Sequence, residues 1–156
     1  MESLVVRRAL VKDVAELVRL RGVMYHGMGV DDSNDEWKVV TARRLTSELP
    51  RATIVGGVVE RRFEPGLCGA GLLRLDEVLG SPRFPRGLVA HVGSVAVDPE
   101  WRRRGIGESI LRFLIDEARA LGVERLELHA TPDGEGIYRR LGFEDRGGGV
   151  ELRMNL

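Results

Sequence analysis

The chain has 156 residues, of which 43% are hydrophobic and 31% are charged, and its 24 basic residues balance its 24 acidic ones. This length and composition are typical of one globular domain with a sizeable core, and they exclude a disordered chain. The net charge of zero argues against a nucleic-acid-binding protein or an anionic-membrane protein, because both usually carry a basic excess.

Cysteine and histidine usage narrows the chemistry further. Cys68 is the only cysteine, so an internal disulfide and a cysteine-based zinc site are excluded. The three histidines, His26, His91 and His129, lie far apart and lack metal-site spacing. The opening residues have too short an apolar run for a signal peptide, and no stretch approaches the ~18 apolar residues of a membrane span. We therefore expect a cytoplasmic protein without a bound metal.

The first half of the chain predicts two helices between short strands. Apolar residues at helical spacing and a polar stretch that ends before Pro50 indicate the helices, and β-branched runs indicate the strands. The expected order is a strand at 4–9, a helix at 12–25, an acidic loop at 30–36, a helix at 36–48, a strand at 52–60, a hairpin connection at 61–66 and a strand at 67–75.

The second half predicts a buried strand that leads into a strongly amphipathic helix. Ile106, Ile110, Leu114 and Ala118 recur every four residues in that helix. The expected order is a loop at 76–87, a strand at 88–97, a helix at 106–121, a strand at 124–130, a helix at 133–141 and, after the glycines at 147–149, an alternating strand at 149–155. The pattern indicates a mixed α/β fold.

The turn between the strand at 88–97 and the helix at 106–121 has the features of an anion site. The first turn of a helix has unpaired N–H groups and the positive end of the helix dipole. Gly105 and Gly107 allow close backbone approach, and Arg102, Arg103 and Arg104 can contact phosphate. The alternative is a solvated arginine run before an ordinary helix. The Lys-Ser/Thr pair of a P-loop is absent, and so is the third glycine of a dinucleotide fingerprint.

Two motifs in this region resemble those of the GCN5-related N-acetyltransferase superfamily. Arg102-x-x-Gly105-x-Gly107, after a strand that ends in Val-Asp-Pro, resembles motif A of that family. Tyr138-Arg-Arg-Leu-Gly142-Phe143 resembles its Tyr-x-x-x-Gly-Phe motif, and the resemblance covers essentially the whole chain. It implies that residues 1–156 form a single N-acetyltransferase domain. The implied α/β fold is a mixed, mostly antiparallel sheet flanked by helices, with a splayed central strand pair.

The resemblance also implies acetyl-coenzyme A as co-substrate and a primary amine as acceptor, which attacks directly in a ternary complex. The residues Arg102, Arg103, Arg104, Gly105, Ile106 and Gly107 would then hold the pyrophosphate, chiefly through backbone N–H groups. Val95 and Val97 would pair with the pantetheine arm, and a backbone N–H near Val97 would hold the thioester oxygen. The asparagine of many relatives is replaced by His129-Ala130-Thr131, so its cofactor contact does not carry over.

Two catalytic candidates follow from the same comparison. Tyr138 would be the general acid for the departing thiolate, and its alternative role is that of a core aromatic residue. His91 lies six residues before Val97, and an imidazole suits removing a proton from an ammonium near neutral pH. The alternative for His91 is a structural or substrate-pocket histidine.

The acceptor is less defined than the cofactor, and a small molecule and a peptide both fit. The acidic loop residues Asp31, Asp32, Asp35 and Glu36 predict a cationic amine, unless they only cap the following helix. Two other functions compete: an acyl-coenzyme A sensor without turnover, and an RNA- or DNA-binding module, which the zero net charge and the lack of an aromatic platform oppose. A homodimer, the acyl-chain preference and the general base stay open.

Overall fold

The computed structural model describes residues 4–131, 134–147 and 149–156. Its core is a five-stranded sheet in the order β1-β2-β3-β4-β5, in which all neighbours are antiparallel except the parallel pair β4 and β5. The elements are β1 (Val6–Arg8), η1 (Val11–Asp13), α1 (Val14–Gly27), α2 (Glu36–Glu48), β2 (Ile54–Glu60), β3 (Leu67–Glu77), β4 (Leu88–Val97), η2 (Pro99–Trp101), α3 (Ile106–Ala120), β5 (Arg125–Glu127) and α4 (Glu135–Arg140).

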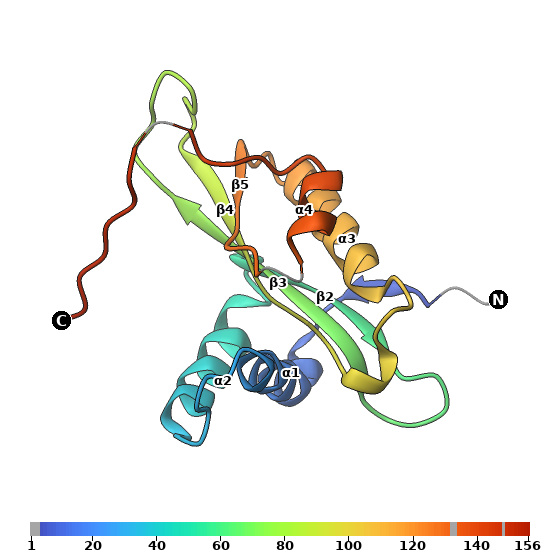
Figure 1. Ribbon diagram of the computed structural model, residues 1–156. Coiled ribbons are helices and arrows are strands. Elements are labelled where there is room, and N and C mark those ends of the chain that lie inside the picture. The colour runs from blue at the N-terminus through green and yellow to red at the C-terminus, as the bar shows by residue number, and fades with distance from the viewer. Residues whose placement is uncertain (1–3, 132–133, 148) are drawn as a thin grey trace.

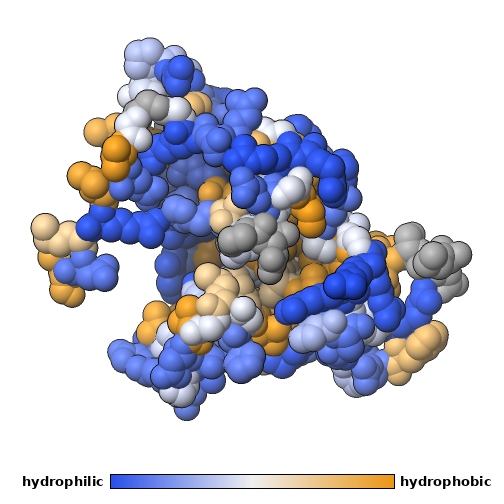
Figure 2. Space-filling view, in the orientation of Figure 1, coloured by the Kyte–Doolittle hydropathy of each residue, from blue (hydrophilic) through white to orange (hydrophobic). Residues whose placement is uncertain are grey.

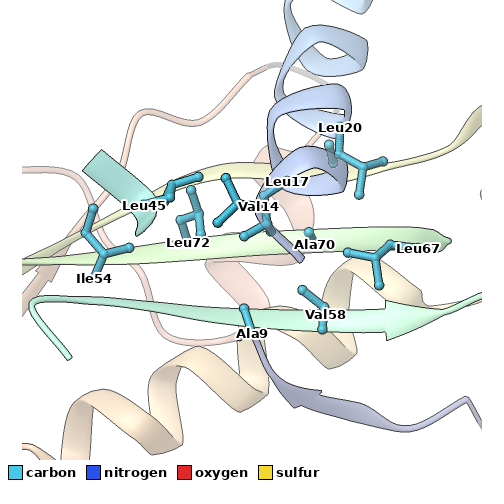
Figure 3. Packing of buried hydrophobic residues seen from close by; sticks show 11 residues of the cluster. Ala9, Val14, Leu17, Leu20, Leu45, Ile54, Val58, Leu67, Ala70 and Leu72 are labelled. Carbon is cyan, nitrogen blue, oxygen red and sulfur yellow. The ribbon is translucent and has the colours of Figure 1, made fainter. Parts of the chain in front are cut away.

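Helices cover both faces of this sheet (Figure 1). Helices α1 and α2 cover one face, where Leu20 and Leu45 pack with Val58 and Leu72 of the strands (Figure 3). Helix α3 covers the other face with a second buried cluster that includes Ile110 and Leu114. Side chains alternate between these faces along each strand, so each residue of β4 faces one helical layer or the other.

Two glycines of β3 bring α3 close to the sheet. A Cβ atom on Gly69 would lie 2.8 Å from Ile106 Cγ2, and one on Gly71 would lie 2.7 Å from Ile110 Cγ2. Real Cβ atoms do not approach that closely, so larger residues at these positions would push the helix away. The glycines therefore fix the depth at which the first turn of α3 sits beside the end of β4.

Strand β4 separates from β5 halfway along its length. The parallel pairing covers only Val89 to His91 on β4, with His91 opposite Glu127, and β4 then continues to Val97. On its other side β4 stays paired with β3, although a bulge sets Ser94 and Val95 opposite the single residue Gly71. The expected splay of the central strand pair is confirmed, and beyond His91 no strand among the described residues pairs with this edge of β4.

Most predicted elements are confirmed, and the largest error concerns the C-terminus. Residues 149–156 form no strand, and the side chains of Val150, Leu152 and Met154 are more than 80% exposed. An alternating pattern becomes a strand only where a neighbouring edge accepts its backbone hydrogen bonds, and this segment runs away from the sheet (Figure 1).

The remaining differences are smaller. The strand expected at 124–130 is shorter, since β5 ends at Glu127, where its pairing with β4 ends. Residue 133 of the predicted helix 133–141 and Gly148 of the predicted glycine turn lie outside the described residues. No helix in the described part of the chain is long and apolar enough to cross a membrane.

Candidate functional site

The loop between β4 and α3 exposes its backbone. Arg103 (φ 64°) and Gly105 (φ 76°) both adopt left-handed conformations. Such residues beside right-handed or extended ones can form a concave row of N–H groups that suits an anion. A Cβ on Gly105 would meet no heavy atom within 4 Å, and one on Gly107 would meet only Val97 Cγ2, at 4.0 Å. A ligand can therefore approach the start of α3 closely.

The three arginines of this loop have different positions. The Nε of Arg102 donates to the carbonyl of Val97 at 3.1 Å, so this side chain folds back on the end of β4. The guanidinium of Arg104 lies 4.8 Å from the ring centre of Trp101 and donates to the carbonyl of Glu100. Arg103 is exposed, and its side chain has no polar partner among the described residues. Arg103 is thus the most available of the three for a phosphate.

The unpaired edge of β4 presents backbone groups to the gap beside β5. The N–H of Asp98 donates to the carbonyl of Cys68 on β3 at 2.8 Å. Because backbone groups alternate along a strand, those of Val97 point away from β3, toward the gap. The side chains of Val95 and Val97 pack in the hydrophobic cluster on the α3 face. The structure therefore places both predicted pantetheine-binding residues along the open edge.

A buried carboxylate anchors the start of the loop. Asp98 is 3% exposed, and Arg19 of α1 donates to its two oxygens at 2.9 and 3.0 Å, while Arg61 donates to one of them. Burial raises the pKa of Asp98, but the hydrogen bonds and charges of Arg19 and Arg61 outweigh it and hold this pKa below its usual value. In the sequence, Asp98 stands out only as part of Val-Asp-Pro, which gives no signal for this anchor.

Tyr138 lies on α4, on the same face of the sheet as α3. Its ring packs in the cluster that contains Val95, Val97 and Ile106, and it meets Phe143 edge-on at 6.1 Å. Burial raises the pKa of the Tyr138 hydroxyl, which therefore holds its proton more firmly than an exposed phenol. Helix α4 is tied to the first turn of α3 by Arg140, which donates to Glu108 at 3.1 Å.

Gly134 makes room for Tyr138, and sequence reasoning assigned it no such role. A Cβ on Gly134 would lie 2.9 Å from Cε2 of the tyrosine ring and 3.3 Å from its hydroxyl oxygen. Any larger residue would push the ring out of its place. The Tyr-x-x-x-Gly-Phe spacing alone gives no signal for this contact, because it depends on how the helix starts.

His91 stands at the point where β4 and β5 part. Its Nδ1 lies 3.4 Å from the carbonyl of Glu127, and its Nε2 lies 3.6 Å from the carboxylate of that residue. Its cross-strand partner on β3 is Arg74, and the neighbouring pair Leu72 and Gly93 belongs to the α1–α2 face. Directly paired residues share a face, so His91 points to that side, opposite the Tyr138 side.

A small cavity on the α1–α2 face was not predicted. It measures about 240 Å³ and is lined by residues that include Arg21, Tyr25, Asp31, Asp32 and Trp37. In the sequence, Arg21 follows the apolar residues of the first helix at helical spacing, and a charged residue on such a face was the available signal. Figure 2 shows hydrophobic side chains in the middle of the face that it draws, between the side of the molecule that carries β5 and the α1–α2 layer.

Comparisons with known proteins agree with this geometry. Glucosamine 6-phosphate N-acetyltransferase 1 of Oryza sativa subsp. japonica is 38% identical over 71 residues, which cover 44% of this chain and 43% of that protein. The mycothiol acetyltransferase of Clavibacter michiganensis is 28% identical over 134 residues, which cover 78% of this chain and 43% of that protein. The chain thus spans less than half the length of these curated relatives.

One solved structure shares the whole fold. It is a predicted acetyltransferase with acetyl-CoA from Clostridium acetobutylicum, with a TM-score of 0.86, 20% identity and coverage of 97% of this chain and 96% of that one. The family model that describes the acetyltransferase (GNAT) family matches residues 49–143, which run from the end of α2 to the residue after Gly142. The match includes the glycine loop, the open edge of β4 and Tyr138, and the chain belongs to the acetyltransferase (GNAT) family.

Proposed function

We propose that the protein, as one N-acetyltransferase domain over residues 1–156, transfers the acetyl group of acetyl-coenzyme A to a primary amine. The observation that carries this proposal is the gap beside β4. The strand leaves β5 at His91, runs on with one edge unpaired and ends at a glycine loop that opens the first turn of α3. Such an open edge can pair with the amide groups of a long ligand, and the glycine loop can receive its phosphates.

The described residues fit acetyl-coenzyme A at both ends. The open space above Gly105 and Gly107 leaves room for a pyrophosphate, and the N–H groups of the first helical turn have no partner inside the helix. Along the strand, Val95 and Val97 would exchange backbone hydrogen bonds with the pantetheine amides. Arg103 would add a charge-assisted contact to a phosphate.

The chemistry would use the two faces of the sheet. Acyl transfer forms a C–N bond between the amine and the carbonyl carbon and breaks the C–S bond of the thioester. His91, on the α1–α2 face, would take the proton that the ammonium must lose before it attacks. The N–H of Val97 would hold the negative charge that develops on the carbonyl oxygen. Tyr138, on the α3–α4 face, would give its proton to the departing sulfur. The second proton that the nitrogen loses as the amide forms would pass to solvent, from which Tyr138 would regain its own.

The direct test follows the release of coenzyme A thiol with a panel of primary amines. We expect acetyl-coenzyme A to raise the melting temperature and at least one amine to release thiol with formation of the acetylated amine. Stabilisation without thiol release across a broad panel would identify a sensor and contradict the proposed reaction. An absence of stabilisation, combined with binding of RNA or DNA, would contradict the cofactor site itself.

A further inference from the structure

The cavity on the α1–α2 face contains a half-buried arginine without a carboxylate partner. Among the described residues, no acidic group lies within ion-pair distance of the Arg21 guanidinium, and its Nε is buried with no hydrogen-bond partner. Its Nη1 donates to Ser94, and its guanidinium lies 5.1 Å from the ring centre of Tyr25. Burying a charge without an opposite charge is costly, so this site favours an anionic ligand group.

Arg21 reaches the stretch of β4 along which acetyl-coenzyme A would bind. Ser94, its hydrogen-bond partner, lies in the bulge of β4, next to Val95 on the open edge. Ser94 also adopts a left-handed conformation (φ 54°), which fits its place in the bulge. An anion bound by Arg21 would therefore lie beside β4, on the face of the sheet to which His91 points.

The lining of the same cavity also carries negative charge. The backbone N–H of Ser33 holds the carboxylate of Asp31 at 3.0 Å and, with the Ser33 side chain, keeps the pKa of Asp31 below its usual value. Asp32 packs against α1 at Gly22, where a Cβ would lie 3.4 Å from its Oδ2. The acidic loop therefore divides: Asp31 and Asp32 line the cavity, whereas Asp35 pairs with Lys38 in the first turn of α2.

The size and lining of the cavity restrict the ligand further. A volume of about 240 Å³ is below the ~300–1,000 Å³ usual for drug-sized ligands. The rings of Tyr25 and Trp37 meet edge-on at 5.4 Å, and the Trp37 Nε1 donates to the carbonyl of Asp32 at 3.4 Å. The cavity therefore has fixed aromatic walls, one cation at the strand and two anions at the loop.

From this arrangement, and on the basis of the proposed function, we infer that the acceptor is a small amphoteric amine. Its carboxylate or phosphate would bind Arg21, and a second positive charge, in an acceptor that carries one, would face Asp31 and Asp32. A purely cationic acceptor, which the acidic loop alone predicts, would bring its positive charge against Arg21.

The test compares acceptors that differ by one charged group. Lysine, lysinamide and cadaverine form one series, in which the carboxylate is first neutralised and then removed. Glucosamine 6-phosphate and glucosamine form the other, which tests the phosphate. We expect kcat/KM for one of the acceptors that carry a carboxylate or phosphate to exceed that of the counterpart without this group by about tenfold or more, as for a hydrogen bond to a charged group.

Variants assign this preference to Arg21. Arg21→Gln should abolish the preference, mainly through the acceptor KM, while the KM for acetyl-coenzyme A stays unchanged. Arg21→Lys should keep part of it, because the charge remains without the planar fork. Arg43→Gln removes an exposed positive charge elsewhere on α2 and should keep the preference in full. Replacing Asp31 and Asp32 by Asn should raise the KM for lysine more than the KM for an acceptor without a second positive charge.

Calorimetric titration of the same compounds into protein saturated with coenzyme A separates this inference from the proposed reaction. Binding of an anionic member that depends on Arg21, without any turnover, would support the inference and contradict the reaction. Turnover with cadaverine or lysinamide that equals or exceeds turnover with lysine, together with no phosphate preference, would overturn the inference and leave the reaction intact. A preference that persists in Arg21→Gln would overturn it as well.

Discussion

The cofactor side and the acceptor side of the candidate site are built in different ways. The cofactor side consists mainly of backbone groups from one continuous stretch, residues 94–107, held in place by the close packing of α3 on Gly69 and Gly71. The acceptor side consists of side chains from α1, α2 and their connecting loop, and its link to the sheet joins residues 73 positions apart, Arg21 and Ser94. A backbone site tolerates many side-chain changes, whereas a side-chain site changes its ligand with each substitution.

The largest effect on turnover is expected at Tyr138, on the cofactor side. Tyr138→Phe removes the hydroxyl with little change of volume, so kcat should fall by roughly tenfold to thousandfold while acetyl-coenzyme A binds almost as before. Steady-state kinetics and calorimetric titration check the two parts. Gly134→Ala, which crowds the ring, should reproduce part of the loss. An unchanged kcat under conditions where chemistry limits the rate would assign Tyr138 to the core alone.

The glycine loop should be sensitive to charge rather than to side-chain identity. Gly105→Asp places a carboxylate against the pyrophosphate, and repulsion of about 2–3 kcal/mol at ~6 Å and an effective dielectric of ~20 weakens binding about 100-fold. The measurement is the rise in melting temperature with acetyl-coenzyme A. Gly105→Ala controls for strain at φ 76°, and Gly27→Asp adds the same charge on the opposite face. Equal stabilisation of wild type and Gly105→Asp would refute this site.

The ion pairs of Asp98 with Arg19 and Arg61 should make the free energy of unfolding sensitive to acid. Because the pKa of Asp98 is lowered in the folded protein, its contribution is complete above the ordinary carboxyl pKa of ~3.9 and is lost as the pH falls through the lowered value. Asp98→Asn should therefore cost roughly 1.5–3 kcal/mol at pH 7 in urea unfolding, and this cost should shrink steadily as the pH falls below ~3.9. Asp116→Asn, at an exposed pair with Arg119, should cost little at either pH.

The smallest effect is expected at His91, on the acceptor side. His91→Gln should lower kcat/KM by about tenfold, because the amide cannot take a proton from the ammonium. His26→Gln, at the exposed end of α1, should leave kcat/KM unchanged. An unchanged kcat/KM in the His91 variant would show that another group, or water, removes the proton.

The sequence was sufficient to predict the elements around the glycine loop, because their signals are local. Strand, glycine turn and amphipathic helix follow one another within residues 88–121, and each has its own pattern of side chains. Likewise, the splay was predictable from the resemblance, and the structure adds where it begins, at the pair His91 and Glu127.

The acceptor side was not predictable in the same way. The guanidinium of Arg21, the rings of Tyr25 and Trp37 and the cavity that they line depend on how α1 and α2 pack, which no local pattern reports. The prediction of a C-terminal strand was wrong for a related reason. The alternation of Val150, Leu152 and Met154 indicates which residues would share a face, but not whether a neighbouring strand edge is available.

Helix α1 holds the two sides at one fixed spacing. Arg19 and Arg21 are two residues apart, a rise of about 3 Å, and one ends on Asp98 at the entry to the glycine loop while the other ends on Ser94 in the bulge. A shift of this helix toward an acceptor would therefore alter its hydrogen bonds to Ser94 and Asp98, which lie at the two ends of the open stretch of β4. Any such linkage is reciprocal, so a filled cofactor gap would change acceptor affinity by the same factor as the acceptor changes that of the cofactor.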